Sequence, residues 1–417
     1  MDRAGARSLK SLTERGTQFY KNKDYRAAIK KFKEAYALNP NDYIVKVNLI
    51  NAYIGHAIKL KNMGDFDTSL KTLNEALEIE DTVPEIRLIL ASLYYDQGDY
   101  VSALGELQIA RIYRPDSTAI STMLGEIYFQ EGKLEQALKM WTQSQKREPY
   151  NTSLSNKIER VKREWKIQKS FEIKHSHPFV IKYKKHNAGL ADKVLRILMD
   201  AYVDIGRKMN YFPLSDIIVI VYDNDDFYEA TGARGTIASL YDGKIRLKVS
   251  DKLDNIHFLR EILFHEYTHV LIRFISNDSC PFWLNEGLAQ VLSHSSATVD
   301  LDALNNLELE SDFFHLTKLE TFNGLTKCRE HDIDMNVSIK LAYLKSLITA
   351  NYITSVYGLD SCIELLKKLK MKKTVIEAVQ ETLGLDINEL DTIIEKKIYN
   401  AKQKLLELNK EMDNTGN

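Results

Sequence analysis

The first third of the chain repeats itself, and this periodicity constrains the fold more than any other feature. Four units of about 34 residues begin near Leu9, Tyr43, Pro84 and Thr118, and each pairs two helix-periodic halves. Short polar turns separate the halves, at 22–25, 63–66, 97–100 and 131–134. Such a unit cannot bury its apolar face alone, so the units must stack into a helical solenoid.

Two details refine this prediction. The second unit carries about seven extra residues around Lys59 to Met63, which predicts a longer first helix or a longer turn. Residues 153–170 are charged but place apolar side chains at helical spacing. They therefore predict a helix that caps the last unit.

The unit length and the order of small and aromatic residues resemble the tetratricopeptide repeat. The resemblance implies a concave face that binds a partner protein through positions 2, 5, 9 and 12 of each repeat. Position 12 is occupied by Tyr20, Ile54, Tyr95 and Phe129. The alternative is that these four side chains are partly buried packing residues. The groove has no dense set of Lys and Arg, so it does not suit a carboxylate tail.

A second motif lies in an apolar, helix-periodic stretch at 264–270, which reads F-H-E-Y-T-H-V. His265 and His269 are four residues apart and therefore share one face of a helix. Glu266 is offset by one position, where its carboxylate can act beside an ion rather than bind it. Two imidazole ligands and a neighbouring carboxylate base are typical of zinc hydrolases.

The segment W-L-N-E-G-L-A-Q at 283–290 supplies a further ligand, because Glu286 follows His269 by 17 residues. A catalytic zinc usually takes three protein ligands. Together the two motifs resemble the gluzincins, in particular the peptidase MA-like domains that follow tetratricopeptide repeats. The resemblance implies that His265, His269 and Glu286 bind one Zn²⁺ per chain and that Glu266 is the general base. The alternative for Glu286 is a solvated carboxylate at a helix start.

The same resemblance implies two further roles. The segment 341–346, L-A-Y-L-K-S, is similar to a family helix whose Tyr stabilises the oxyanion, which makes Tyr343 the candidate. The strand at 245–249 is expected at the lip of the cleft, where Ile245, Arg246 and Leu247 would pair with an extended substrate. The alternatives are a packing tyrosine and an ordinary hairpin. Related sequences tend to carry an acidic residue where this chain has Gln290. An amide can accept a hydrogen bond but cannot share charge, so this difference would lower the affinity for zinc.

Between and beyond these motifs, the periodicity predicts a small mixed sheet and several helices. Strands are expected at 179–183, 217–222 and 245–249, and helices at 190–209, 253–274, 338–356, 360–369, 375–383 and 387–408. The fold class is therefore mainly α with a smaller α+β part. The solenoid is expected over 1–170, a gluzincin-like metallopeptidase domain with a helical subdomain over 171–410, and a frayed tail over 411–417.

These features favour a zinc metallopeptidase that hydrolyses peptide bonds with a zinc-activated water. The alternative is a non-catalytic interaction scaffold with a structural or degenerate zinc site, and a zinc hydrolase of other substrates is a third possibility. The net charge of −1 gives no reason to expect nucleic acid, and no apolar run has the length of a membrane span. No signal peptide is visible, so a cytoplasmic location is expected, or the cell envelope if a leader was removed.

Overall fold

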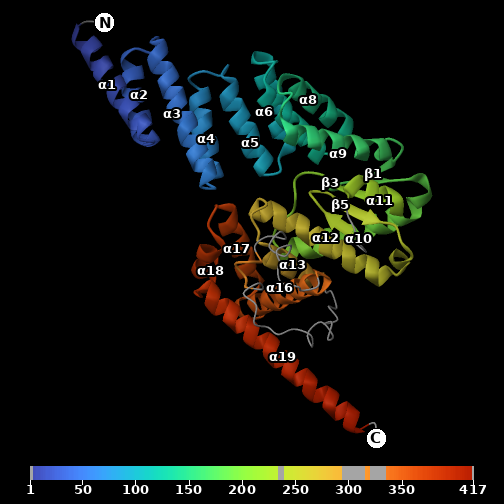
Figure 1. Cartoon of the computed structure of the whole chain (residues 1–417). Helices are drawn as coiled ribbons and strands as arrows, with labels where there is room; N and C mark the ends of the chain where they lie inside the picture. Colours follow the sequence, from blue (N-terminus) through green and yellow to red (C-terminus); the bar gives the residue numbers. More distant parts are fainter. Residues whose placement is uncertain (1–2, 233–238, 294–314, 320–334, 416–417) are drawn as a thin grey trace. The chain divides into compact units, whose positions relative to one another are not determined.

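The computed structural model describes residues 3–232, 239–293, 315–319 and 335–415. The chain divides into two compact units, Met1–Lys162 and Arg163–Asn417. The division falls inside a helix, slightly before the boundary at 170 that the sequence suggested. Each unit is described separately below (Figure 1).

The first unit consists of paired helices. They are α1 (Arg3–Lys21), α2 (Tyr25–Leu38), α3 (Tyr43–Asn62), α4 (Phe66–Leu77), α5 (Pro84–Asp96), α6 (Tyr100–Tyr113), α7 (Thr118–Gln130) and α8 (Leu134–Arg147). Aspartates such as Asp24 and Asp65 cap the second helix of a pair by accepting a backbone N–H in its first turn. Gly64 and Gly98 take positive φ in the preceding turns. Buried small residues, among them Ala28 and Ala103, let the paired helices approach closely.

Helix α3 accommodates the extra residues of the second repeat. It is 20 residues long, whereas the equivalent helices α5 and α7 have 13 each. The insertion therefore lengthens the first helix of the repeat rather than its turn. Helix α9 (Thr152–Gln168) follows the last repeat, and its Leu154 and Ile158 pack on Phe129 and Trp141 as a cap would.

The second unit begins with a mixed sheet and ends in helices. Its strands are β1 (Glu172–Ser176), β2 (Phe179–Tyr183), β3 (Ile217–Tyr222), β4 (Ser239–Tyr241) and β5 (Ile245–Lys248). Its main helices are α10 (Ala188–Lys208), α11 (Asn224–Thr231), α12 (Ile256–Ser276), α13 (Phe282–Leu292), α16 (Met335–Tyr357), α17 (Leu359–Lys370), α18 (Val375–Leu383) and α19 (Ile387–Thr415). The sheet order is β1-β2-β3-β5-β4, with β2, β3 and β5 parallel and the two outer pairs antiparallel.

Alternation along the strands gives the sheet two buried faces. On one face, residues such as Ile181, Val219 and Leu247 pack against α10 and α12 in the largest apolar core. On the other face, Ile218 and Tyr222 pack against α11 and the end of α9. The sheet therefore lies between the helix that carries the H-E-x-x-H motif and the last turns of α9.

The strand at 245–248 is not at an edge of the sheet, so this part of the substrate prediction is wrong. Strand β5 pairs with β3 on one side and with β4 on the other, which occupies its backbone groups. Ile245 and Leu247 are fully buried, and only 2% of Arg246 is exposed. The short strand β4, to which the sequence analysis gave no residue range, is the outermost strand on this side. It forms an antiparallel hairpin with β5, as the alternative prediction stated.

The helical part of the second unit follows the predicted order closely. Helices α16, α17 and α18 lie within a few residues of their expected bounds. Helix α19 continues to Thr415, so the expected tail from residue 411 is helical up to that point. Among the described helices, none combines the length and the apolar character needed to cross a bilayer.

Candidate metal centre

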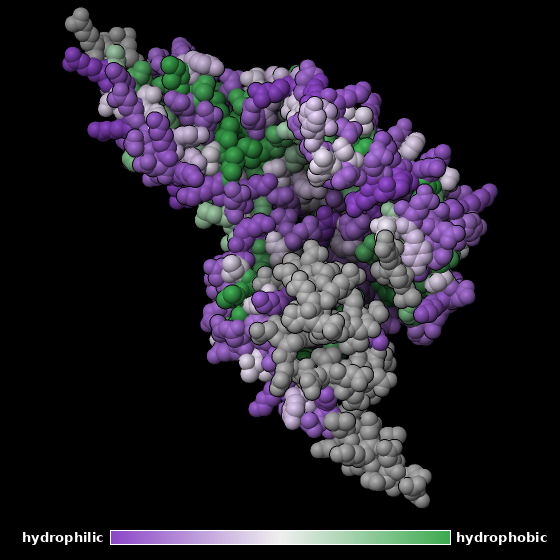
Figure 2. All heavy atoms as spheres, viewed as in Figure 1, coloured by the Kyte–Doolittle hydropathy of each residue, from purple (hydrophilic) through white to green (hydrophobic). Residues whose placement is uncertain are grey.

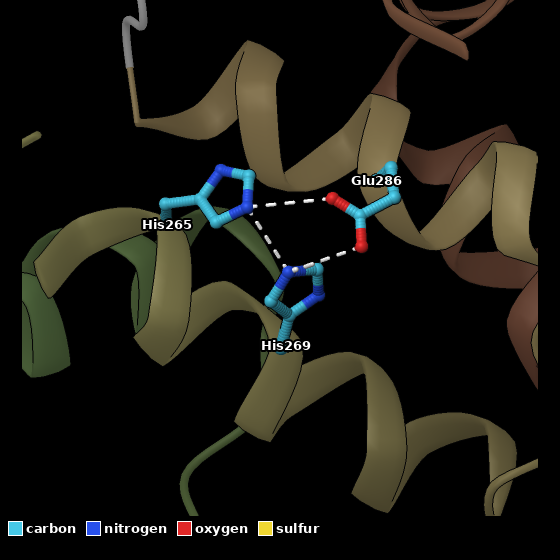
Figure 3. Close-up of side chains that lie close together, drawn as sticks. All are labelled: His265, His269 and Glu286. Atoms are coloured by element: carbon cyan, nitrogen blue, oxygen red, sulfur yellow. Dashed lines mark hydrogen bonds and ion pairs between the residues drawn. The ribbon is translucent and has the colours of Figure 1, made fainter. Parts of the chain in front are cut away.

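Two consecutive helices bring the three expected ligands together. Helix α12 starts at the N-cap Asn255 and ends where Asn277 adopts positive φ, and a short turn leads to Pro281, the N-cap of α13. His265 and His269 lie on α12 and Glu286 lies on α13, and their side chains point toward one another (Figure 3). The predicted triad is therefore assembled in space.

The distances within the triad fit a single metal ion. The Nε2 atoms of His265 and His269 are 3.1 Å apart. The carboxylate oxygens of Glu286 lie 3.5 Å from Nε2 of His265 and 3.7 Å from Nε2 of His269. Three ligand atoms that each lie about 2.1 Å from a tetrahedral zinc are roughly 3.4 Å apart. One carboxylate ligand and two imidazole ligands also match the preferences of catalytic zinc.

Asn285, the residue before the candidate ligand Glu286, fixes the orientation of one imidazole. Nδ1 of His269 lies 2.9 Å from Oδ1 of Asn285, and an amide oxygen can only accept a hydrogen bond. His269 therefore carries its proton on Nδ1 and presents the lone pair of Nε2 to the triad. That is the tautomer a zinc ligand requires.

Glu266 is buried next to the ligands and keeps one oxygen available. Its Oε1 accepts a 2.6 Å hydrogen bond from the Oγ of Ser239 on β4. Its Oε2 is buried and has no hydrogen-bond partner among the described residues. Buried polar atoms are normally paired, so an unpaired carboxylate oxygen beside a metal triad suits contact with a water molecule.

The electrostatics of the triad favour positive charge at its centre. Burial lowers the pKa of His265, but its bond to Glu286 and the charges of Glu266 and Glu286 outweigh this and leave the pKa raised. Burial raises the pKa of Glu286, but the neighbouring His269 and His265 outweigh this and leave it lowered. The nearby carboxylates therefore favour positive charge on His265, and the two histidines favour the ionised form of Glu286.

Tyr343 lies on α16, which packs closely against α13. Its ring makes an edge-to-face contact with Phe282, with 5.6 Å between centroids. Burial raises the pKa of the Tyr343 hydroxyl, and the charges of Glu286 and Glu266 raise it further. Tyr343 is therefore within electrostatic reach of both carboxylates and stays protonated, as a hydrogen-bond donor must.

Gln290 has a different role from the acidic residue that the resemblance led us to expect there. Its amide donates to the backbone oxygen of Tyr343 at 3.0 Å and to that of Glu286 at 3.2 Å. Gln290 therefore links α13 to α16 by a hydrogen bond close to Glu286 and Tyr343. His257 is exposed at the start of α12, and His294 lies outside the described residues.

A cavity of about 300 Å³ adjoins the triad on the side of His269. Its wall is formed by Tyr241, Asp242, Gly243, His269, Ile272, Arg273, Ser276, Asp278, Cys280 and Asn285. The ring of Tyr241 is stacked on the imidazole of His269, with centroids 6.3 Å apart and planes 14° apart. Strand β4 thus contacts both the candidate base Glu266, through Ser239, and the candidate ligand His269, through Tyr241.

The four groove residues predicted in the repeats do not share one environment. Tyr20 is 38% exposed, Ile54 and Tyr95 are partly buried, and Tyr95 lines a cavity of about 400 Å³ with residues of α7. Phe129 is only 6% exposed and packs against Trp141 under α9, so its assignment to the binding face is wrong. Figure 2 shows apolar surface around α3 and α4 on the face in view.

Comparisons with known proteins bear on the repeats. The tetratricopeptide repeat family matches residues 54–108 and 88–144. Tetratricopeptide repeat protein 21A of Mus musculus is 27% identical over 122 residues, which span 29% of this chain and 9% of the mouse protein. The chain is also similar to two solved structures. A thermophilic tetratricopeptide protein of Thermus thermophilus has 18% identity and a TM-score of 0.23, over 37% of this chain and 98% of that one. MamA MSR-1 C2 has 17% identity and a TM-score of 0.25, over 36% and 78%.

The family match confirms the tetratricopeptide repeats that the sequence predicted. Stacked repeats of this kind present extended surfaces to proteins, so the first unit is of a protein-interaction type. The gluzincin-like domain remains a prediction, which rests on the residues of the second unit.

Proposed function

We propose that this protein is a zinc-dependent peptidase whose tetratricopeptide repeats recruit a protein substrate or partner. The observation that carries the proposal is the convergence of His265, His269 and Glu286, with ligand atoms 3.1–3.7 Å apart and Glu266 beside them. A structural zinc site is normally closed by four protein ligands. Three ligands and an adjacent carboxylate instead suit a hydrolytic site.

Each residue of the site has a distinct task in this proposal. The chemistry expected from a bound zinc ion is polarisation of the scissile carbonyl and a lower pKa for water. Glu266 accepts the proton of the attacking water on its unpaired oxygen and passes it to the leaving amine. Ser239 holds the other oxygen of Glu266 and so orients the carboxylate. The hydroxyl of Tyr343 donates a hydrogen bond to the oxygen that becomes negative.

Strand β4 replaces β5 as the proposed substrate-binding edge. Among the described strands, β4 pairs only with β5, and its outer side faces away from the sheet. An extended peptide that added to this edge would run beside Glu266, because Ser239 on β4 contacts that residue. The backbone would provide affinity, and adjoining side chains would provide sequence preference.

The comparisons favour the second candidate, an interaction scaffold, because the repeats are the part of the chain that they match. In that role the repeats bind a partner and the metal site holds the fold together. The two functions differ in whether the chain turns over a peptide.

Metal analysis combined with a peptide digest tests the peptidase proposal. We expect about one zinc per chain, cleavage of a random peptide library, and loss of both with His269→Ala. The matched control is His257→Ala, which changes an exposed histidine on the same helix and should alter neither. Full zinc occupancy in His269→Ala would refute the ligand assignment. Zinc binding by a wild type that cleaves no peptide would support the scaffold.

A further inference from the structure

A cluster of buried charges lies on the face of the sheet opposite the metal triad. Glu164 of α9, Lys182 of β2, Arg246 of β5 and Lys244 of the β4–β5 turn are each at most 9% exposed. One carboxylate therefore faces one buried guanidinium and two buried lysines, and Asp242 at the rim is the second acidic group. Burial lowers the pKa of both lysines, that of Lys244 to about 7, and the charge of Glu164 opposes this shift. The proposed reaction uses none of these groups.

Glu164 is the centre of this cluster. Its oxygens accept hydrogen bonds from Nη1 and Nη2 of Arg246 at 2.9 and 3.2 Å, a two-pronged pairing that fixes both side chains. Gln168 donates to the same carboxylate at 2.7 Å. Nζ of Lys244 lies 3.8 Å away. Burial raises the pKa of Glu164, but attraction to Lys244 and Arg246 outweighs this and lowers the pKa to about 2.

The cluster is connected to the metal site through the hairpin of β4 and β5. Arg246 Nε donates to Asp242 Oδ1 at 2.9 Å, so Arg246 joins Glu164 to the turn of the hairpin. Lys244, at the other end of the same turn, forms an ion pair with Glu164. In the register of the hairpin, Leu240 of β4 lies opposite Arg246.

Because side chains alternate along a strand, fixing the hairpin on the face of the charged cluster also fixes the β4 side chains on the opposite face of the sheet. Leu240 points toward the face of the cluster, so its neighbours Ser239 and Tyr241 point toward α12. There Ser239 donates to Glu266, and Tyr241 stacks on His269. A shift of the turn would therefore move both contacts at once, whereas the ligands themselves are held by α12 and α13.

We propose that Glu164 is a positioning residue for the site: through Arg246 and Lys244 it fixes the β4–β5 hairpin, which holds Ser239 against Glu266 and Tyr241 against His269. This inference rests on the proposed function where it concerns turnover, but its structural claim can be tested separately. Without Glu164, the guanidinium of Arg246 and the two buried lysines would share one rim carboxylate. The hairpin would then open to hydrate Lys244 and Arg246, because buried unpaired charges are strongly disfavoured.

The test uses the full chain with Glu164→Gln, and with Glu159→Gln as the control on the exposed side of the same helix. We expect Glu164→Gln to keep one zinc, to exchange the amide hydrogens of 239–247 faster than wild type, and to lose roughly 10- to 100-fold in kcat/KM on a short peptide. Glu159→Gln should match wild type in all three measurements.

A second variant separates positioning from simple stabilisation. Glu164→Gln/Lys244→Met also replaces the buried lysine, whose pKa burial lowers to about 7, with an uncharged side chain. The variant therefore leaves no ammonium group to hydrate at the turn, but the turn still lacks its anchor. We expect Tm to recover toward wild type while kcat/KM stays low and exchange at 239–247 stays fast. If Glu164→Gln alone does not fold, the exchange and activity measurements are made on this double variant.

Three results would overturn the inference. They are wild-type exchange at 239–247 in Glu164→Gln, recovery of activity in step with Tm in the double variant, and loss of zinc in Glu164→Gln. Failure of the proposed function looks different, because wild type would then bind zinc without cleaving any peptide. The exchange measurement would still decide whether Glu164 positions the hairpin.

Discussion

At the scale of single residues, the contact between Asn285 and His269 determines which nitrogen of His269 faces the candidate metal triad. The amide oxygen of Asn285 holds the Nδ1 proton of His269 and leaves Nε2 free to bind. His265 has a different support, since its Nε2 faces Glu286 and its pKa is raised by neighbouring carboxylates. The two histidines are thus unequal in how firmly their tautomers are set.

We expect Asn285→Ala to weaken zinc binding by roughly 10- to 100-fold, because the imidazole of His269 would lose its orienting acceptor. Competition with a zinc-selective indicator measures the change. Asn285→Asp keeps an acceptor at the same place and should retain most of the affinity. Equal affinity in wild type and Asn285→Ala would show that packing alone orients His269.

Ionisation of Glu164 makes the folding stability of the protein depend on pH in the acidic range. Its pKa is about 2 in the folded chain, compared with an ordinary value of 4.5. Because the folded pKa is depressed, the ionised carboxylate contributes stability that is complete above pH 4.5 and is lost as the pH falls toward 2. A shift of this size corresponds to about 3 kcal/mol.

Urea unfolding of zinc-free protein between about pH 7 and pH 2.5 tests this response. The difference in unfolding free energy between wild type and Glu164→Gln should be largest near neutrality and should shrink below pH 4.5. A difference that is the same at every pH would rule out ionisation of Glu164 as its source. Zinc is left out because protonation of the histidine ligands would add a second transition.

The sequence could indicate which side chains converge at the candidate site because a fixed helical spacing encodes most of them. His265, Glu266 and His269 occupy one short stretch, and Glu286 follows in a recognisable segment. Ser239 could not be predicted, because a three-residue strand has too little alternation to be detected. The only sequence signal for Asn285 was its position next to the candidate ligand Glu286. Its hydrogen bond to His269 depends on how α12 and α13 pack, which the sequence does not reveal.

At the scale of elements, the crossing of α13 and α16 brings Glu286 and Tyr343 together. A Cβ on Gly287 would lie 2.2 Å from the backbone oxygen of Ser346 and 2.7 Å from Cβ of Ala350. Only glycine permits this approach, and Gln290 adds hydrogen bonds across the same crossing. The glycine of the second motif therefore has a packing reason that is independent of catalysis.

Gly287→Ala should destabilise the second unit by roughly 1–3 kcal/mol or more, because a backbone atom stands in the way of the new methyl group. Zinc affinity should fall as well, since Glu286 is the adjacent residue. Gly189→Ala is the matched control, because a Cβ there meets nothing within 4 Å. Chemical denaturation of both variants measures the effect, and equal stability would show that the helices can separate freely.

The sequence predicted helices well where the hydrophobic periodicity extended over many residues. It failed where the environment of an element depends on which strand or helix packs beside it. The extra residues of the second repeat lengthen α3, one of the two expected outcomes. Strand β5 was found at the expected residues, but its place inside the sheet depends on β4, which the sequence did not reveal. Phe129 had the spacing of a groove residue, but α9 buries it.

At the scale of the whole molecule, the chain joins an interaction module to a unit that holds the complete candidate site. The repeats are confirmed by the family match over 54–144. His265, Glu266, His269, Glu286 and Tyr343 all lie within Arg163–Asn417. Binding through the repeats would raise the effective concentration of an attached substrate at this site.

The most direct test of the proposed peptidase is turnover by wild type and Glu266→Gln, both loaded with zinc. The substitution removes the proton acceptor but leaves all three ligands, so Glu266→Gln should bind zinc like wild type and lose roughly 10²- to 10⁴-fold in kcat/KM on a peptide from the library digest. Glu364→Gln, which changes an exposed carboxylate on α17, should retain full activity. Full hydrolysis by zinc-loaded Glu266→Gln would contradict the mechanism.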